Sequence, residues 1–144
     1  MSTEENKALV RRFYEEVFNK KNLTGVDAFV DPQIIEHALP PGLPGSIEGT
    51  KQFIGMYLKA FPDLHLTTED MIAEGNKVVA RITARGTHQG EFMGIPPTGK
   101  QVTMTGIQIV RTADGRITEN WINLDALGLL QQLGVVPPPG HASS

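Results

Sequence analysis

The stretch that decides the fold is ENWINLDALGLLQQLG, residues 119–134, in which a strand pattern passes directly into a helix pattern. Side chains alternate across a strand, so Trp121, Asn123 and Asp125 share one face and the aliphatic residues between them share the other. The helical pattern follows at once and ends at Gly134, a residue type that commonly terminates helices. The sequence therefore predicts a strand that carries an aromatic ring, an amide and a carboxylate on one face and leads into a short helix.

Asp125 has two interpretations that the pattern alone leaves open. A carboxylate beside an aromatic ring, at the end of a strand, suits an acid/base in a half-apolar pocket. An aspartate immediately before a helix also suits a helix cap, because its side chain can accept a backbone amide hydrogen of the first turn. One residue can serve in both roles.

The length and charge of the chain fit a single small domain that does not bind nucleic acid. Its 144 residues are enough to bury a hydrophobic core. The formal net charge is −3, and the charges are mixed along the chain rather than gathered in a basic stripe. We expect one domain over residues 1–136 and a disordered tail over residues 137–144.

Several chemistries are excluded by what the sequence lacks. There is no cysteine, which removes disulfides, thiolate catalysis and cysteine-ligated metals. No metal site is expected, because the histidines lie far apart without the spacing of metal ligands; they are His37, His65, His88 and His141. No segment approaches the roughly 20 apolar residues that span a bilayer, and the acidic start MSTEE is unlike a signal peptide, so we expect a cytoplasmic protein with no membrane partner.

Hydrophobic periodicity predicts helices in the first half of the chain and mainly strands in the second. Helices are expected at about 2–20, with a capping box at Ser2 and Glu5, and at about 24–30, 49–61 and 126–133. Strands are expected around 34–36, before a proline-rich loop, and at about 64–74, 77–89, 101–111 and 116–124. This order predicts an α+β fold in which the helices pack on one face of a mostly antiparallel sheet.

Three polar residues interrupt or end the apolar strand patterns. His88 is the polar end of an otherwise apolar strand face, which suits either a half-exposed rim residue or an acid/base in a pocket. Gln108 lies within an apolar stripe, so its amide must be hydrogen-bonded to a ligand or to protein. His37 stands where a strand meets the proline-rich loop, and either contacts a substrate or holds that loop in place.

Three aromatic residues are candidates for pocket walls. Tyr14 and Tyr57 fall within the apolar faces of two helices, where a tyrosine is more often a core residue with a satisfied hydroxyl than a catalyst. Trp121 suits a core or pocket wall, and such a wall can stack on a flat ligand. Trp121 and Asp125, together with the three polar residues above, predict one largely apolar cavity with a few polar groups.

Five segments of the chain resemble the SnoaL-like polyketide cyclases, in the same order along nearly the whole length. They are NKALVRRFY (6–14), FPD (61–63), GIPPTGK (94–100), GIQIVR (106–111) and the part of the opening stretch from 121 to 134. The resemblance implies the nuclear transport factor two-like fold, a cone-shaped α+β barrel. In that fold a curved, mostly antiparallel sheet wraps around the N-terminal helices and leaves a deep apolar pocket.

The resemblance also implies an activity. Characterised cyclases of this family close a ring of an aromatic polyketide by intramolecular aldol condensation, with no metal or organic cofactor. On this basis Asp125 is expected to be the acid/base, with His88 and His37 as further catalytic residues. Substrate contacts are expected at Gln108, Trp121, Asn123, Tyr14 and Tyr57. The expected partners are an apolar small molecule, aromatic or carbonyl-bearing, and a second copy of the chain in a homodimer.

Other functions remain open on the sequence. Within the same superfamily, an isomerase would use a carboxylate base with Tyr14 as the donor to an oxyanion. An epoxide hydrolase would need an arginine beside Asp125, and the predicted strand faces place none there. A protein that binds a small molecule without catalysis, or that uses its outer sheet face for dimerisation, is the alternative outside the enzyme class.

Overall fold

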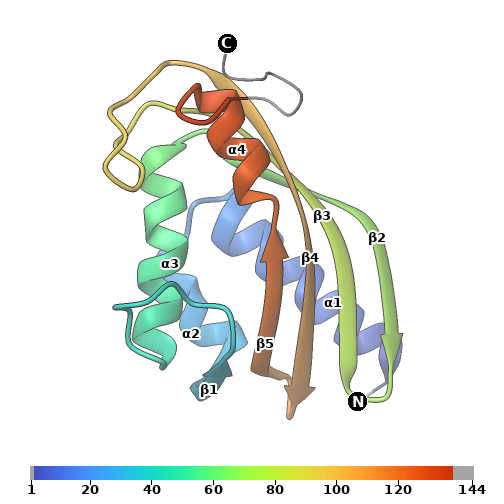
Figure 1. The fold of residues 1–144 in the computed structure, drawn as a ribbon. Coiled ribbons are helices and arrows are strands. Elements are labelled where there is room, and N and C mark those ends of the chain that lie inside the picture. The colour runs from blue at the N-terminus through green and yellow to red at the C-terminus, as the bar shows by residue number, and fades with distance from the viewer. Residues whose placement is uncertain (1, 138–144) are drawn as a thin grey trace.

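A curved five-stranded sheet forms the frame of the molecule in the computed structural model, which describes residues 2–137 (Figure 1). Its strands are β1 (Val30–Glu36), β2 (His65–Glu74), β3 (Lys77–Thr87), β4 (Gln101–Ala113) and β5 (Arg116–Leu124). They lie in the order β1-β5-β4-β3-β2, and every neighbouring pair is antiparallel except β1 and β5. The predicted α+β fold with a curved, mostly antiparallel sheet is confirmed.

Within the described residues, four α-helices accompany this sheet. They are α1 (Thr3–Phe13), α2 (Val26–Phe29), α3 (Ile47–Ala60) and α4 (Ala126–Leu133). The sheet curves around α1, α3 packs beside β1, and α4 follows β5 (Figure 1). The predicted capping box at the start of α1 is confirmed, because the Ser2 hydroxyl accepts the Glu5 amide hydrogen and the Glu5 carboxylate accepts the Ser2 amide hydrogen.

The end of the first helix differs from the prediction. The sequence predicts one regular helix to about residue 20, but from Tyr14 to Asn19 the backbone continues as a wider π-helical turn. Asn19 ties this turn to β2: its side chain accepts the Leu66 amide hydrogen and donates to the Leu66 carbonyl oxygen. Turns of this kind are rare and often occur at functional sites.

The start of β1 replaces the end of a predicted helix. Residues 24–30 are predicted to be helical, but α2 ends at Phe29 because Val30 pairs with Ile117 in the sheet. β1 then runs through Pro32, which has no amide hydrogen to donate. An edge strand tolerates a proline because one of its sides has no neighbouring strand.

The hydrophobic core lies between α1 and the inner face of the sheet, which is the face turned toward that helix. Alternate residues of the two central strands are buried on this face, namely Val78, Ala80, Ile82 and Ala84 on β3 and Val102, Met104, Gly106, Gln108 and Val110 on β4. From α1 the core receives Leu9, Val10 and Phe13. The predicted apolar faces of these two strands are therefore the buried ones, with Gln108 as the polar interruption.

The predicted tail falls largely outside the described residues, which end at Pro137, and so does His141. Among the described helices none is both long and apolar enough to cross a bilayer.

Candidate active site

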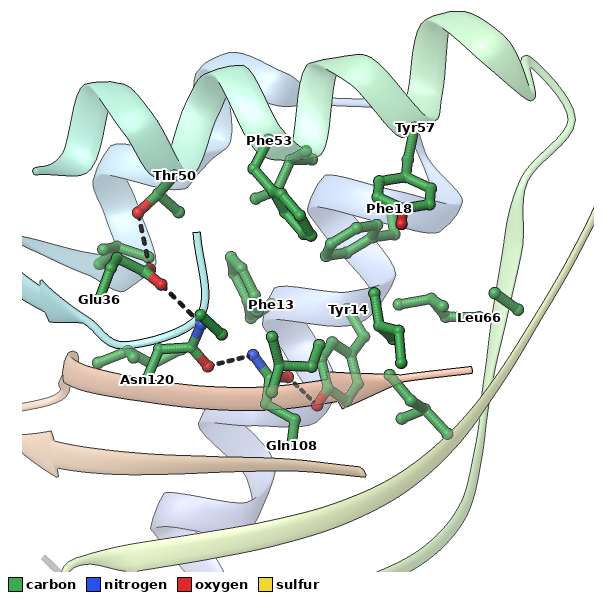
Figure 2. Close-up of a pocket in the computed structure, with 18 of the residues that line it drawn as sticks. Phe13, Tyr14, Phe18, Glu36, Thr50, Phe53, Tyr57, Leu66, Gln108 and Asn120 are labelled. Atoms are coloured by element: carbon green, nitrogen blue, oxygen red, sulfur yellow. Dashed lines mark hydrogen bonds between the residues drawn. The ribbon is translucent and has the colours of Figure 1, made fainter. Parts of the chain in front are cut away.

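An apolar cavity lies between the inner face of the sheet and the helices α1 and α3 (Figure 2). The space between its walls amounts to about 860 Å³ when the open solvent at its mouth is included. Aromatic rings dominate the helical side, where the wall is made by Phe13, Phe18, Phe53 and Tyr57. Aliphatic side chains dominate the sheet side and the loop after β1, with Ile34, Ala38, Leu39, Leu64, Leu66, Ile82, Ala84, Met104, Ile117, Ile122 and Leu124.

Few polar side chains reach this cavity. They are Tyr14, Glu36, Thr50, Tyr57, Gln108 and Asn120. Glu36 is the one carboxylate among the lining residues that the structure describes, and no lysine, arginine or histidine is among them. The cavity therefore combines apolar walls with a single anionic group and several neutral hydrogen-bonding groups.

Five of the polar groups form a continuous hydrogen-bonded chain (Figure 2). The Thr50 hydroxyl donates to Glu36 Oε1 over 2.8 Å, and Asn120 Nδ2 donates to Glu36 Oε2 over 2.8 Å. Gln108 Nε2 donates to Asn120 Oδ1 over 2.7 Å, and the Tyr14 hydroxyl donates to Gln108 Oε1. Every donor in this chain points toward Glu36, so the carboxylate fixes the orientation of both amides.

The sheet register explains why these residues meet. β1 lies parallel to β5, and this pairing sets Glu36 directly beside Asn120. In the antiparallel pair of β4 and β5, Gln108 lies opposite Ile122, two residues beyond Asn120 on the same face. Thr50 reaches Glu36 from the first turns of α3. The site is thus assembled by two helical segments and three strands, at the edge where β1 joins the sheet.

Burial changes the acid–base properties of the cavity residues. It raises the pKa of the Glu36 carboxyl above its ordinary value, and the hydrogen bonds from Asn120 and Thr50, with the charge of His37, offset part of this rise. Burial also raises the pKa of the Tyr14 hydroxyl well above the usual range and raises that of Tyr57. The tyrosines therefore stay protonated donors, while Glu36 is a stronger base than a surface glutamate.

Asp125 does not line this cavity, and the prediction that it does is wrong in its placement. Its carboxylate caps α4, where Oδ1 accepts the Gly128 amide hydrogen over 2.9 Å. The side chain is exposed and borders a shallow depression on the outer face of the sheet, with Arg81 and Ile107 among its neighbours. Of the two interpretations of Asp125, the geometry matches the cap.

β5 turns its other face inward, so Trp121 and Asn123 also lie away from the cavity. His37, which directly follows β1, does not line the cavity either. Ile122 lies opposite Gln108, so the face of β5 that shares the cavity holds the aliphatic residues and not the tryptophan. The Trp121 ring stacks on the His37 ring, with centroids 4.8 Å apart, and His37 Nε2 pairs with Glu119 over 2.7 Å. Asn123 is exposed on the outer face.

His88 is fully buried but is not among the cavity-lining residues. Its Nδ1 accepts the Thr98 amide hydrogen over 3.2 Å and lies 3.0 Å from the Thr98 hydroxyl oxygen. The ring packs against Phe61, with centroids 5.6 Å apart. His88 therefore anchors the loop between β3 and β4, and the expected half-exposed rim position is wrong.

Three of the predicted site residues do meet in the cavity, namely Tyr14, Tyr57 and Gln108. Thr50, Asn120 and Glu36 are not among the predicted site residues. The alternation of side chains along a strand indicates an inward position for two of them. Glu36 shares a strand face with the buried Ile34, and Asn120 shares one with Ile122. In the part of the chain that the structure describes, no group of three or more histidine, aspartate or glutamate side chains is placed to hold a metal.

Comparison with known proteins agrees with this architecture. A family model described as SnoaL-like polyketide cyclase matches residues 8–133. The chain is 29% identical over 119 residues to the nogalonic acid methyl ester cyclase of Streptomyces nogalater, a match that covers 81% of this chain and 89% of that protein. It is 29% identical over 131 residues to the aklanonic acid methyl ester cyclase DnrD of Streptomyces peucetius, covering 88% of each.

The solved structures with this fold include one that is described as a candidate hydroxylase and not as a cyclase. TsrD from Streptomyces laurentii superposes with a TM-score of 0.85 at 29% identity, covering 94% of this chain and 99% of that one. AclR from Streptomyces galilaeus, described as a candidate hydroxylase, has a TM-score of 0.85 at 34% identity and covers 95% of this chain and 85% of that one. The likeness therefore identifies the family and the fold more closely than the reaction.

Proposed function

The chain belongs to the SnoaL-like polyketide cyclase family, and we propose that it closes a ring of a polyketide by intramolecular aldol condensation without a cofactor. The names of the relatives in Streptomyces nogalater and Streptomyces peucetius support this reaction, since both are cyclases of polyketide methyl esters. The family model spans residues 8–133, which include every described residue of the cavity wall.

The observation that carries the proposal is an apolar cavity with one carboxylate and a set of neutral hydrogen-bonding groups. An aldol condensation needs a base that removes a proton beside a carbonyl, and a shaped space that folds one chain over itself. Apolar walls favour the flat, largely aromatic substrate. The second amide hydrogens of Gln108 and Asn120 and the Tyr57 hydroxyl can hold its carbonyl oxygens.

The structure gives little support to Asp125 as the acid/base of this reaction. Its carboxylate accepts the Gly128 amide hydrogen outside the lining, so a substrate held in the cavity would not touch it. We assign to Asp125 the structural role of a cap.

The test is conversion of two polyketides, nogalonic acid methyl ester and aklanonic acid methyl ester, by the purified protein. An aldol ring closure loses no atoms, so the product should have the mass of the substrate and a different retention time in liquid chromatography with mass detection. Heat-unfolded protein is the control for spontaneous cyclisation. No conversion of either ester by folded protein would contradict the proposal.

A second candidate is a proton-transfer isomerase, which the presence of Glu36 and the Tyr57 hydroxyl in one cavity supports, whereas the Tyr14 hydroxyl donates to Gln108. Such an enzyme moves a proton along a carbonyl compound and stabilises the enolate with a hydroxyl donor. Conversion of a β,γ-unsaturated steroid ketone to its conjugated isomer, followed by ultraviolet absorption, distinguishes this candidate. An epoxide hydrolase has less support, because no arginine is among the described cavity residues.

A further inference from the structure

We propose that Glu36 is the acid/base of this cavity, and that Thr50 and Asn120 are positioning residues that hold its carboxylate toward the substrate. The inference rests on the proposed function, since it names the group that would perform the proton transfers of the aldol reaction. It assigns the reaction to the end of β1 and not to the end of β5.

The first argument is the composition of the cavity wall. Glu36 is the one carboxylate among its described residues, and the other titratable side chains there are Tyr14 and Tyr57. Both tyrosines have a pKa that burial raises, so neither is available as a base near neutral pH. Glu36 has its own pKa raised by the same cause, which brings it closer to the pH at which a general base works best.

The second argument is the way in which the carboxylate is held. Thr50 donates to one oxygen and Asn120 to the other, each over 2.8 Å, and the two donors come from different elements. An ionised carboxylate offers about four acceptor sites, so two stay free for a proton of the substrate. Donors on both oxygens also hold the carboxylate in one orientation, which is what a positioned base requires.

The third argument is the chain of amides behind the carboxylate. Asn120 Oδ1 accepts a hydrogen bond from Gln108 Nε2, and Gln108 Oε1 accepts one from the Tyr14 hydroxyl. None of these neutral groups competes with Glu36 for a proton, and all lie in the same wall. They therefore provide hydrogen-bonding groups for a substrate carbonyl within the wall that contains the base.

The proton transfers balance without an additional reactant. The Glu36 carboxylate removes a proton from the carbon beside one carbonyl, and the electrons of that bond form an enolate. The enolate carbon then bonds to a second carbonyl carbon of the same molecule, and the electrons of that C=O double bond become an alkoxide. Glu36 returns its proton to the alkoxide, so the carboxylate is regenerated and nothing is oxidised or reduced.

The decisive variant is Glu36→Gln, which keeps the size and most hydrogen-bonding capacity of the side chain. With the two methyl esters as substrates, we expect kcat to fall by about 10²–10⁴-fold and KM to change little. The matched control is Glu119→Gln, which removes a carboxylate from β5 outside the cavity and should keep the wild-type kcat. Thermal unfolding of each variant shows whether its fold is intact.

A pH profile distinguishes a base from a structural residue. The wild-type kcat should fall as the pH drops through the raised pKa of Glu36, because only the carboxylate removes a proton. Glu36→Asp should keep this acidic limb at a lower rate, and Glu36→Gln should lose it. The charged group that also acts on Glu36 is His37, the residue directly after β1, while Lys51 on α3 pairs with Asp27.

A second readout does not depend on the identity of the natural substrate. The aromatic ketone β-tetralone has an acidic benzylic position, and its exchange with deuterium in D2O can be followed by proton NMR. We expect wild-type protein and Glu119→Gln to accelerate this exchange, and Glu36→Gln not to.

The outcomes separate the two proposals. One result is that the wild-type protein cyclises neither ester but still accelerates deuterium exchange, and that Glu36→Gln loses this acceleration. This result overturns the proposed function and supports Glu36 as the cavity base. A folded Glu36→Gln variant with wild-type kcat, or with wild-type exchange, overturns the assignment of Glu36. Wild-type protein that accelerates neither reaction overturns both.

Discussion

Asp125 caps α4, and its replacement separates this structural role from an acid/base role. We expect Asp125→Ala to lower the free energy of unfolding by about 1 kcal/mol, because alanine cannot accept the Gly128 amide hydrogen. Asp125→Asn should leave that free energy almost unchanged, since asparagine caps helices equally well. Urea denaturation measures both values, and cyclisation assays should give both variants the wild-type kcat.

Gly128 offers a companion to this experiment. A Cβ atom at position 128 would lie 2.2 Å from Asp125 Oδ2, so Gly128→Ala should displace the capping carboxylate. If the cap is the role of Asp125, the double variant with Asp125→Ala should be less destabilised than the sum of the single changes. A large loss of kcat in Asp125→Asn at unchanged stability would instead return the acid/base role to Asp125.

The sequence located some site residues and not others because it does not state which face of β5 is inside. The patterns around Gln108, Tyr14 and Tyr57 were apolar on one side only, so these residues were placed correctly. On β5 both faces carry large apolar side chains, so the strand pattern alone predicts Trp121 on the inner face as readily as Ile122. Pairing with β4 settles the face, and that pairing is a property of the sheet and not of the strand.

At the level of elements, the proline-rich loop and α3 meet in a contact that only glycine allows. A Cβ atom at position 49 would lie 1.7 Å from the Pro44 carbonyl oxygen and 2.8 Å from a methyl group of Leu39. Leu39 is part of the cavity wall. We therefore expect Gly49→Ala to push this loop away and to lower the free energy of unfolding by about 1–3 kcal/mol, as overpacking does.

The matched control lies in the same helix. At Gly55 the nearest contact of an added Cβ is 3.5 Å, an ordinary distance, so Gly55→Ala should be neutral or should stabilise α3 by up to about 1 kcal/mol. Urea denaturation gives both stabilities, and KM for the methyl esters reports the effect on the wall. Equal free energies of unfolding for the two variants would show that the proline-rich loop moves aside without destabilising the fold.

Element boundaries were predictable where the cause is local and not where it is a distant contact. The strand from Arg116 to Leu124 has the predicted limits, set by a turn on one side and a helix cap on the other. The π-helical turn was not predictable, because it depends on Asn19 binding the backbone of Leu66, 47 residues away. The early end of α2 likewise depends on a strand that lies far along the chain.

At the scale of the whole molecule, the half-buried Glu36 makes stability depend on pH. Its pKa is raised above the ordinary value of 4.5 in the folded protein, so between the two values the folded state binds more protons than the unfolded chain does. The free energy of unfolding should therefore decrease as the pH rises through this interval and recover as the pH falls.

Urea denaturation at a series of pH values from about 4.5 to 8 measures this slope. Glu36→Gln should flatten it, because glutamine does not titrate. Glu119→Gln should keep the wild-type slope, since hydrogen bonds from His37 and Arg111 lower the pKa of Glu119 and move its titration below this interval. A slope unaffected by Glu36→Gln would contradict the raised pKa.

The fold as a whole followed from the sequence, because the order of helices and strands and five recognisable segments all indicated the same architecture. The homodimer implied by the resemblance stays a prediction. The five segments do not indicate that β1 pairs in parallel with β5, because no local sequence pattern predicts that pairing.

That parallel pairing has a consequence for how the protein matures. Glu36 and Asn120 are 84 positions apart in the chain, and the carboxylate acquires its amide partner only after the chain has been made through β5. Joining such distant segments is slow, because closing a long loop loses chain entropy before the stabilising contacts form. The pair of Glu36 and Asn120 therefore cannot form before β5 has been made, and a chain cut short before β5 lacks the amide that orients the Glu36 carboxylate.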